Sequence, residues 1–128
     1  MRKKIMVVDD DPDILITIRN IFEREGYEVF TVDSGKKCYE LFKNNEIPDL
    51  ILLDIMMPGM SGWMLFDRLK ENPSWKNIPV VFLTVRTDSF AKKAGNSLCE
   101  DYIEKPFDIE DLKKRIDKVM KENNSESL

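Results

Sequence analysis

The sequence contains no histidine and only two cysteines among its 128 residues. Histidine is the side chain that most often acts as a general base near neutral pH, and it is the usual nitrogen ligand of metal ions. Cys38 and Cys99 have no second thiol or histidine nearby in the sequence. This excludes a disulfide framework and predicts that both cysteines are reduced packing residues. Any chemistry of this chain must therefore use carboxylates.

Long apolar runs and clustered basic charge are also missing. No stretch approaches the roughly 18 apolar residues of a membrane span, and the N-terminal residues lack the apolar segment of a secretion signal. The formal net charge is −4, with the 20 basic residues spread along the chain, unlike the one-sided basic surface of a nucleic-acid-binding protein. We therefore expect a cytoplasmic protein with no direct nucleic-acid or membrane partner.

Short apolar runs rich in branched side chains are present instead. The clearest of them lie at residues 5–8, 50–53 and 80–83. Their length and their lack of polar alternation are typical of strands that are covered on both faces of a parallel sheet. Residues 28–32 and 101–104 are weaker strand candidates.

Helical patterns separate these runs. Residues suited to begin the helices are Asp11, Ser34, Ser61 and Asp108. Asp11 and Asp13 are better explained as a cap and a first-turn acid than as metal ligands, and Gly26 is expected to end the first helix. The segment 89–95 is polar and poorly patterned, which predicts a short or mobile fourth helix.

Strands that alternate with helices predict right-handed crossovers, with helices on both faces of a parallel sheet. The fold class is therefore α/β, doubly wound, with five strands and five helices. We expect this domain to occupy residues 1–122 and residues 123–128 to form a polar, disordered tail. Folds of this class bind ligands where the strands end.

Polar side chains follow the predicted strands at that edge. Asp9 and Asp10 follow the first strand, Asp54 the third, Thr84 the fourth and Lys105 the fifth. Three carboxylates brought together there require a cation, and oxygen donors without cysteine or histidine select Mg²⁺, with Mn²⁺ and Ca²⁺ as alternatives. The three negative charges are balanced by one divalent ion and Lys105. A site with this balance can accept a phosphoryl group.

Glycine-rich phosphate loops are absent. Nucleotide-binding folds of this architecture place glycines after the first strand, so that backbone N–H groups hold a phosphate. This chain has "DDDPD" there, and it contains neither GxGxxG nor GxxxxGK[ST]. These features exclude dinucleotide and flavin binding.

Sulfur and aromatic side chains follow the third predicted strand. We expect loop and core packing, not metal ligation, for Met56, Met57 and Met60. Trp63 and Trp75 fit half-buried packing, and a partner surface remains an open alternative.

Four segments, "MVVDDDPD", "DLILLDIMMPGMSGW", "VVFLT" and "DYIEKPF", resemble the receiver domain of two-component response regulators, over residues 3 to about 120. The resemblance implies a flavodoxin-like, CheY-like sheet of order 2-1-3-4-5. It also implies a phosphorelay signalling domain that catalyses only its own phosphorylation and dephosphorylation.

The resemblance assigns roles at the strand ends. It implies that Asp54 is the phosphoacceptor for a phosphohistidine of a partner histidine kinase. It implies that Asp10 binds Mg²⁺ directly, that Asp9 acts mainly through a metal-bound water, and that the backbone carbonyl of Met56 is a further ligand.

The same resemblance covers the fourth and fifth strand ends. It implies that Lys105, held by a cis bond to Pro106, pairs with the acceptor carboxylate and then with a phosphoryl oxygen. Thr84 is expected to hydrogen-bond the phosphoryl group, and Tyr102 to swing inward when that bond forms.

Three features depart from the family pattern. Val85 stands where a small residue is usual, which predicts crowding of the phosphoryl path. Leu98 replaces a glycine, and the interval from Thr84 to Lys105 is one residue shorter than in many members.

Two other functions remain as alternatives. A Mg²⁺-dependent phosphohydrolase with Asp54 as nucleophile would need an acid at position 56, which is Met56. A scaffold that is never phosphorylated would lose an acceptor residue, and none is lost. The sequence does not distinguish a stand-alone relay that binds an effector protein from a receiver attached to an output domain. It also leaves the oligomeric state open, including a dimer that forms on phosphorylation.

Overall fold

The computed structural model describes residues 2–85 and 99–126. The strands are β1 (Lys4–Val8), β2 (Glu28–Val32), β3 (Leu50–Asp54), β4 (Val80–Thr84) and β5 (Asp101–Glu104). The helices in this part of the chain are α1 (Pro12–Arg24), α2 (Gly35–Lys43), α3 (Gly62–Glu71) and α5 (Ile109–Glu126). The predicted helix at 89–95 and the departure at Leu98 lie outside the described residues.

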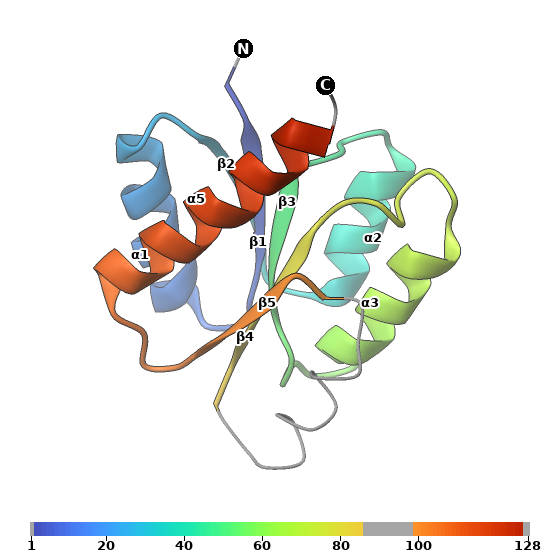
Figure 1. Ribbon diagram of the computed structural model, residues 1–128. Coiled ribbons are helices and arrows are strands. Elements are labelled where there is room, and N and C mark those ends of the chain that lie inside the picture. The colour runs from blue at the N-terminus through green and yellow to red at the C-terminus, as the bar shows by residue number, and fades with distance from the viewer. Residues whose placement is uncertain (1, 86–98, 127–128) are drawn as a thin grey trace.

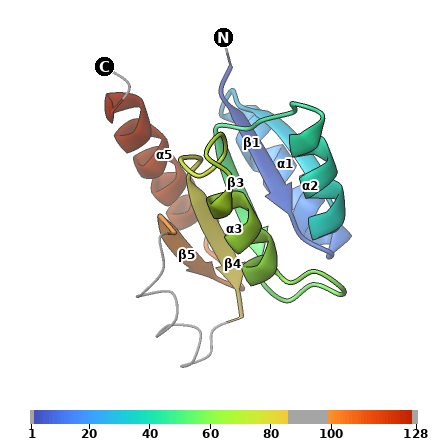
Figure 2. The same cartoon turned by 90° about the vertical axis from the view of Figure 1, so that its right-hand side faces the viewer.

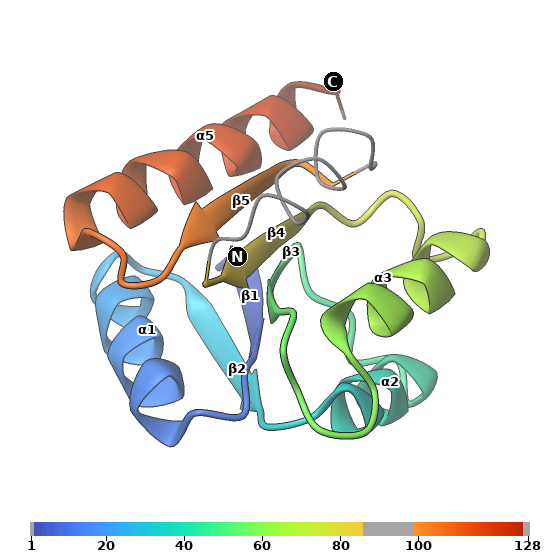
Figure 3. The ribbon, with the colours of Figure 1, turned by 90° about the horizontal axis from the view of Figure 1, so that it is seen from below.

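The strands form one parallel sheet in the order β2-β1-β3-β4-β5, which confirms the predicted fold class and strand order. Helices α1 and α5 cover one face of the sheet, and α2 and α3 cover the other (Figure 1, Figure 2). All strands point toward the same edge, so the loops that follow β1, β3 and β5 lie together there (Figure 3). The order reverses direction between β1 and β3, the position at which such sheets bind ligands.

The helices begin at the residues that the sequence predicts. Side-chain oxygens of the four cap residues accept backbone N–H groups one turn into each helix: Asp11 from Asp13, Ser34 from Lys37, Ser61 from Met64 and Asp108 from Asp111. Gly26 follows α1 with a φ of 93°, a conformation that costs other residues free energy. None of the helices in the described ranges is long and apolar enough to cross a lipid bilayer.

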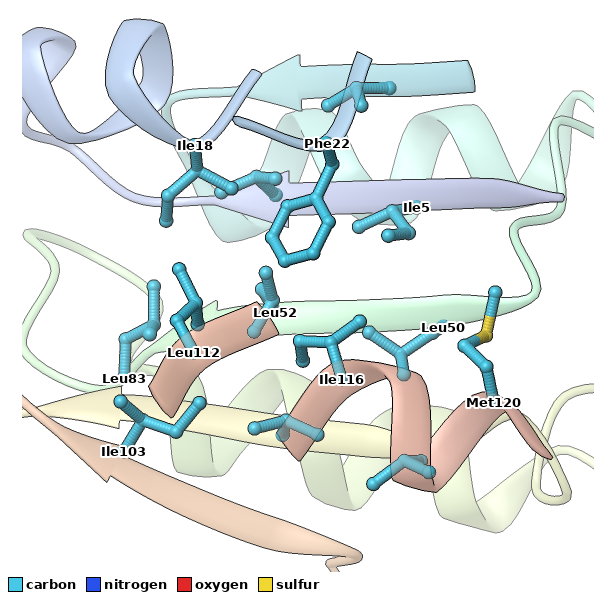
Figure 4. Packing of buried hydrophobic residues seen from close by; sticks show 14 residues of the cluster. Ile5, Ile18, Phe22, Leu50, Leu52, Leu83, Ile103, Leu112, Ile116 and Met120 are labelled. Carbon is cyan, nitrogen blue, oxygen red and sulfur yellow. The ribbon is translucent and has the colours of Figure 1, made fainter. Parts of the chain in front are cut away.

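Two apolar layers separate the sheet from its helices. One layer contains Ile5 and Leu52 from the sheet, Phe22 from α1 and Ile116 from α5 (Figure 4). The other lies under α2 and α3, where Trp63 and Trp75 pack half-buried as predicted. Cys38 is buried and Cys99 is partly buried. Because β1, β3 and β4 are covered on both faces, their side chains are apolar at nearly every position.

Two predicted boundaries need correction. Helix α5 runs through Glu126, so the prediction of a disordered tail from residue 123 was wrong for residues 123–126. The helix continues past its last buried apolar residue, Met120. The side-chain amide of Asn123 also donates to the Val119 carbonyl at 2.8 Å. Asp54 and Thr84 are the last residues of β3 and β4, not the first residues after them. Their backbones are therefore held by strand pairing.

Candidate functional site

The carboxyl edge of the sheet gathers the acidic residues that the sequence singled out. Carboxylate oxygens of Asp9, Asp10 and Asp54 all lie within 4.8 Å of one another. Asp9 and Asp10 follow β1, while Asp54 ends the neighbouring strand β3. Lys105 reaches the same place from the end of β5. Segments far apart in the chain thus meet at the predicted edge.

Asp9 is the most completely enclosed of these groups, with 0% of its surface exposed. Its Oδ1 accepts the backbone N–H of Asp11 at 2.9 Å, and its Oδ2 accepts from Lys105 Nζ at 2.7 Å. Its own N–H donates to the Val32 carbonyl at 3.2 Å, which continues the pairing of β1 with β2. Asp9 is therefore fixed in place, as a buried charge must be. Asp10, by contrast, is exposed.

Lys105 bridges the two buried carboxylates unequally. Its Nζ lies 2.7 Å from Asp9 Oδ2 but 3.4 Å from Asp54 Oδ1, beyond the usual hydrogen-bond length. Burial alone would lower the pKa of Lys105, but the hydrogen bond and charge of Asp9, with the charge of Asp54, raise it above its ordinary value. The lysine therefore stays positively charged. The predicted cis bond to Pro106 is present.

Asp54 is buried but only weakly paired. Burial, followed by the negative charge of Asp9, raises its pKa to about 6, although Lys105 acts in the opposite direction and Asp10 adds a smaller increase. A buried carboxylate with a raised pKa and one weak cationic partner is stabilised when a further positive charge binds beside it. The environment of Asp54 thus differs from that of Asp9, which has both oxygens satisfied.

The loop after β3 is held against Asp54 by a glycine that the sequence analysis did not single out. The N–H of Gly62 donates to the Ile55 carbonyl at 2.9 Å. A Cβ at position 62 would overlap the backbone carbonyl of Asp54 and lie 2.8 Å from Ile55 Cα. Only glycine allows this approach, so Gly62 positions the loop. Its sequence signal is the glycine before the final tryptophan of the segment "DLILLDIMMPGMSGW".

Met56 differs from the other two methionines of this loop in its exposure. Its side chain is 76% exposed, whereas Met57 is buried and Met60 packs partly against the core. Met56 lies in the loop between β3 and α3, and its side chain faces solvent although its neighbours Ile55 and Met57 are buried.

Thr84 ends β4, and Tyr102 lies on the neighbouring strand β5. The Thr84 hydroxyl is buried and donates to the Val85 carbonyl at 3.0 Å. Val85 itself is 64% exposed, so its side chain does not fill the interior beside Thr84. Tyr102 is half-buried, and its backbone N–H donates to Asp101 Oδ1 at 2.8 Å. The switch formed by Thr84 and Tyr102 stays a prediction.

A second group of salt bridges, which was not predicted from the sequence, joins β5 to α5. Arg115 Nη1 lies 3.0 and 3.1 Å from the two carboxylate oxygens of Asp101, and Arg115 Nε donates to Asp111 Oδ2 at 3.0 Å. The spacing of Asp111 and Arg115 by one helical turn is a sequence signal for their pairing. No local pattern indicates the contact with Asp101.

The donor set of the site fits Mg²⁺. Asp9, Asp10 and Asp54 offer hard oxygen atoms from one exposed and two buried carboxylates, without nitrogen or sulfur ligands. Mg²⁺ prefers such oxygens and keeps several of its waters, which the exposed position of Asp10 accommodates.

Fold and site together define a doubly wound α/β domain with an acidic, lysine-bridged edge. The sequence model described as the response regulator receiver domain matches residues 5–117. The chain belongs to this family, and it is a receiver domain of two-component response regulators.

Known proteins agree with this assignment. The chain is 33% identical over 129 residues to the phosphate regulon transcriptional regulatory protein PhoB of Rhizobium meliloti (strain 1021), covering 100% of this chain and 56% of that protein. It is 33% identical over 122 residues to the alkaline phosphatase synthesis transcriptional regulatory protein PhoP of Bacillus subtilis (strain 168), covering 94% and 50%. The chain thus spans about half the length of these relatives.

Solved structures show the same architecture. A putative response regulator from Chloroflexus aurantiacus J-10-fl superposes with a TM-score of 0.84 at 30% identity, covering 94% of this chain and 98% of that one. Chemotaxis protein CheY4 of Vibrio cholerae gives 0.82 at 28% identity, covering 93% and 99%.

Proposed function

We propose that Asp54 accepts a phosphoryl group from a phosphohistidine of a partner histidine kinase. A carboxylate oxygen of Asp54 attacks phosphorus, the bond between phosphorus and the histidine nitrogen breaks, and that nitrogen keeps the electron pair. The product is an acyl phosphate on Asp54. One observation carries this proposal. Three carboxylates, two of them in contact with Lys105, lie together where the strand order reverses between β1 and β3.

Asp9, Asp10 and Asp54, with the backbone carbonyl of Met56, would hold Mg²⁺, or Mn²⁺ in its place. When bound, the ion supplies positive charge against the oxygens of the transferring group. Asp9 is held by Asp11 and Lys105, which keeps its oxygens in place for this purpose.

The remaining chemistry is positioning and charge neutralisation. Phosphoryl transfer needs groups aimed at spreading negative charge more than it needs a general base, which suits a chain without histidine. Lys105 is already shared between Asp9 and Asp54, so a small movement of its Nζ would place it beside a phosphoryl oxygen. The Thr84 hydroxyl would exchange its bond to the Val85 carbonyl for one to the phosphoryl group, and Tyr102 would follow inward.

Labelling by a small acyl phosphate tests the proposal. Incubation with acetyl phosphate and Mg²⁺ should add one phosphoryl group to the wild type and none to Asp54→Asn, as measured by intact mass. Asp67→Asn, which changes an exposed acid on α3, is the matched control and should label like the wild type.

Equal labelling of the wild type and Asp54→Asn would contradict the assignment of Asp54. No labelling of either protein would favour the alternative of a scaffold that acts without phosphorylation.

An autonomous phosphohydrolase is disfavoured by the residue two positions after Asp54. Met56 supplies no carboxyl group there, and its side chain faces solvent. We therefore propose that the chain catalyses only its own phosphorylation and dephosphorylation. Turnover of p-nitrophenyl phosphate by the wild type would contradict this.

The partners follow from the same role. We infer that a histidine kinase donates the phosphoryl group. The signal then passes to an effector, which is either a separate protein or an output domain of a longer chain. These steps would take place in the cytoplasm.

A further inference from the structure

A groove of about 600 Å³ is lined by residues of α2, of the loop after β3 and of α3. These two helices cover the face of the sheet opposite to α1 and α5 (Figure 2). One wall is α2, and the other consists of residues 58–60 together with Arg68 of α3. Helices α2 and α3 lie side by side on this face of the sheet (Figure 3). The groove is separate from the cluster of Asp9, Asp54 and Lys105.

The floor of the groove is apolar and is kept open by small residues. Tyr39 and Met60 are both half-buried in it. A Cβ at Gly35 would lie 3.1 Å from the Met60 sulfur, so the start of α2 and the loop approach closely. Gly59 has a φ of 77°, which favours glycine. These residues leave a depression beside the Tyr39 ring.

Positive charge surrounds this floor. Lys36, Lys43 and Arg68 line the groove, and Glu40 is its one acid, so the lining carries a formal charge of +2 on a chain whose net charge is −4. Lys43 Nζ lies 5.1 Å and Arg68 Cζ 5.8 Å from the centre of the Tyr39 ring. Within residues 2–85 and 99–126, the three cations form no ion pair. Their charge is available to a ligand.

We propose that this groove binds a short acidic segment of a partner polypeptide that carries an aromatic or large aliphatic side chain. The apolar side chain would lie on Tyr39 and Met60, and flanking carboxylates would pair with Lys43 and Arg68. An apolar centre with a charged rim is the usual anatomy of a polypeptide interface. Exposed, flexible cations suit carboxylates spread along a peptide better than one compact anion, which requires converging buried donors.

Binding of a synthetic peptide to the full chain tests this proposal without metal or phosphodonor. The probe is Glu-Glu-Phe-Glu-Glu with blocked ends, titrated against ¹⁵N-labelled protein. We expect saturable shifts of amide signals in α2, residues 58–60 and α3. Lys43→Glu combined with Arg68→Glu should weaken binding about tenfold or more. The matched charge reversal Lys118→Glu on α5, an exposed residue on the opposite face, should leave it unchanged.

Three further probes separate the other outcomes. A Lys-Lys-Phe-Lys-Lys peptide and Glu-Glu-Ala-Glu-Glu should both bind more weakly, since one reverses the charge and the other removes the apolar anchor. Adenosine diphosphate should also bind more weakly, and tighter binding of this nucleotide would assign the groove to a small anion and overturn the proposal.

The proposal would also be overturned if the acidic peptide caused no saturable shifts. The same holds if Lys118→Glu weakened peptide binding as much as the combined Lys43→Glu and Arg68→Glu variant does. Single variants Lys43→Gln and Arg68→Gln provide the same comparison if the double reversal loses its folded spectrum. The titration is repeated on Asp54→Asn, where binding should persist. A failure of the phosphorylation proposal is therefore distinguishable from a failure of this one.

Discussion

Lys105 and Arg115 each bridge two aspartates, but one does so inside the edge of the sheet and the other on the surface. The Lys105 side chain is 18% exposed and contacts two buried acids, whereas Arg115 is 42% exposed and contacts two partly exposed ones. The distances from Arg115 to the carboxylate oxygens are all close to 3.0 Å, whereas those from Lys105 are unequal. The Lys105 Nζ lies 2.7 Å from Asp9. The contact of Lys105 with Asp54 is 3.4 Å.

Burial, not contact geometry, decides what each cluster can do. Water screens the charges around Arg115, so such pairs contribute little to stability. Around Lys105 one cation faces Asp9, Asp54 and the nearby Asp10, which leaves unbalanced negative charge where water is largely excluded. The exposed cluster joins β5 to α5, and the buried one holds negative charge that a cation or phosphoryl chemistry can use.

The largest effect should come from removing the buried cation. Lys105→Met leaves Asp9 buried without its partner, and we expect it to lower the free energy of unfolding by about 3 kcal/mol. Urea denaturation in the absence of Mg²⁺ measures this. Combining it with Asp9→Asn should recover most of the lost stability, because the amide carries no charge. If the double variant is no more stable than Lys105→Met, then packing of the lysine stem, and not charge, holds the site together.

The next effect concerns the metal. Mg²⁺ at a hundredfold excess over its Kd should stabilise the wild type by roughly 2.7 kcal/mol, or on the order of 8 °C in Tm. Asp10→Asn should melt higher than the wild type without metal, because one repelling charge is gone, and should lose most of the gain from Mg²⁺. Thermal melts at several Mg²⁺ concentrations and constant ionic strength measure both changes. A variant that melts lower and still gains as much would make Asp10 a structural residue.

A smaller effect should appear as a pH dependence of the metal-free protein. The pKa of Asp54 is raised to about 6 in the folded chain, so its contribution to stability is present below the unfolded value and is lost as pH rises through about 6. Relative to Asp54→Asn, the wild type should therefore lose on the order of 2 kcal/mol between pH 4 and 7. Urea titrations of both proteins with a chelator present measure the difference. Parallel stability curves would mean that Asp54 titrates at its ordinary pKa.

The smallest effect belongs to the exposed cluster. Arg115→Met should lower the free energy of unfolding by less than about 1 kcal/mol, and added salt should reduce the difference further. Denaturation at low and high salt, in parallel with Lys105→Met, provides the direct comparison. A loss as large as that of Lys105→Met would show that exposure does not separate the two clusters.

The positions of the functional residues could be predicted because they depend on short local patterns. Apolar runs locate the strands, and the residue that follows each run is then placed at one edge of the sheet. Asp9, Asp54 and Lys105 were found in this way and do meet there. Helix caps such as Ser34 and Ser61 are local for the same reason, since each cap bonds an N–H three residues away.

Some features could not be predicted because no local pattern encodes them. The contact of Arg115 with Asp101 depends on how α5 lies against β5. Helix α5 reaches Glu126 although the residues from 123 onward are polar, so composition alone misplaced its end. The groove beside Tyr39 arises from the approach of two segments that are separated in sequence.

The sequence by itself determined the strand and helix pattern, the fold class and the identity of the charged residues at the carboxyl edge, because each rests on periodicity or on position after a strand. Only the tertiary structure decided how those charges are shared. Since β1 lies next to β3 at the centre of the sheet, Asp9 becomes fully enclosed and takes the closer contact with Lys105. Asp54 is left buried and weakly paired, with the Lys105 Nζ at 3.4 Å from its Oδ1.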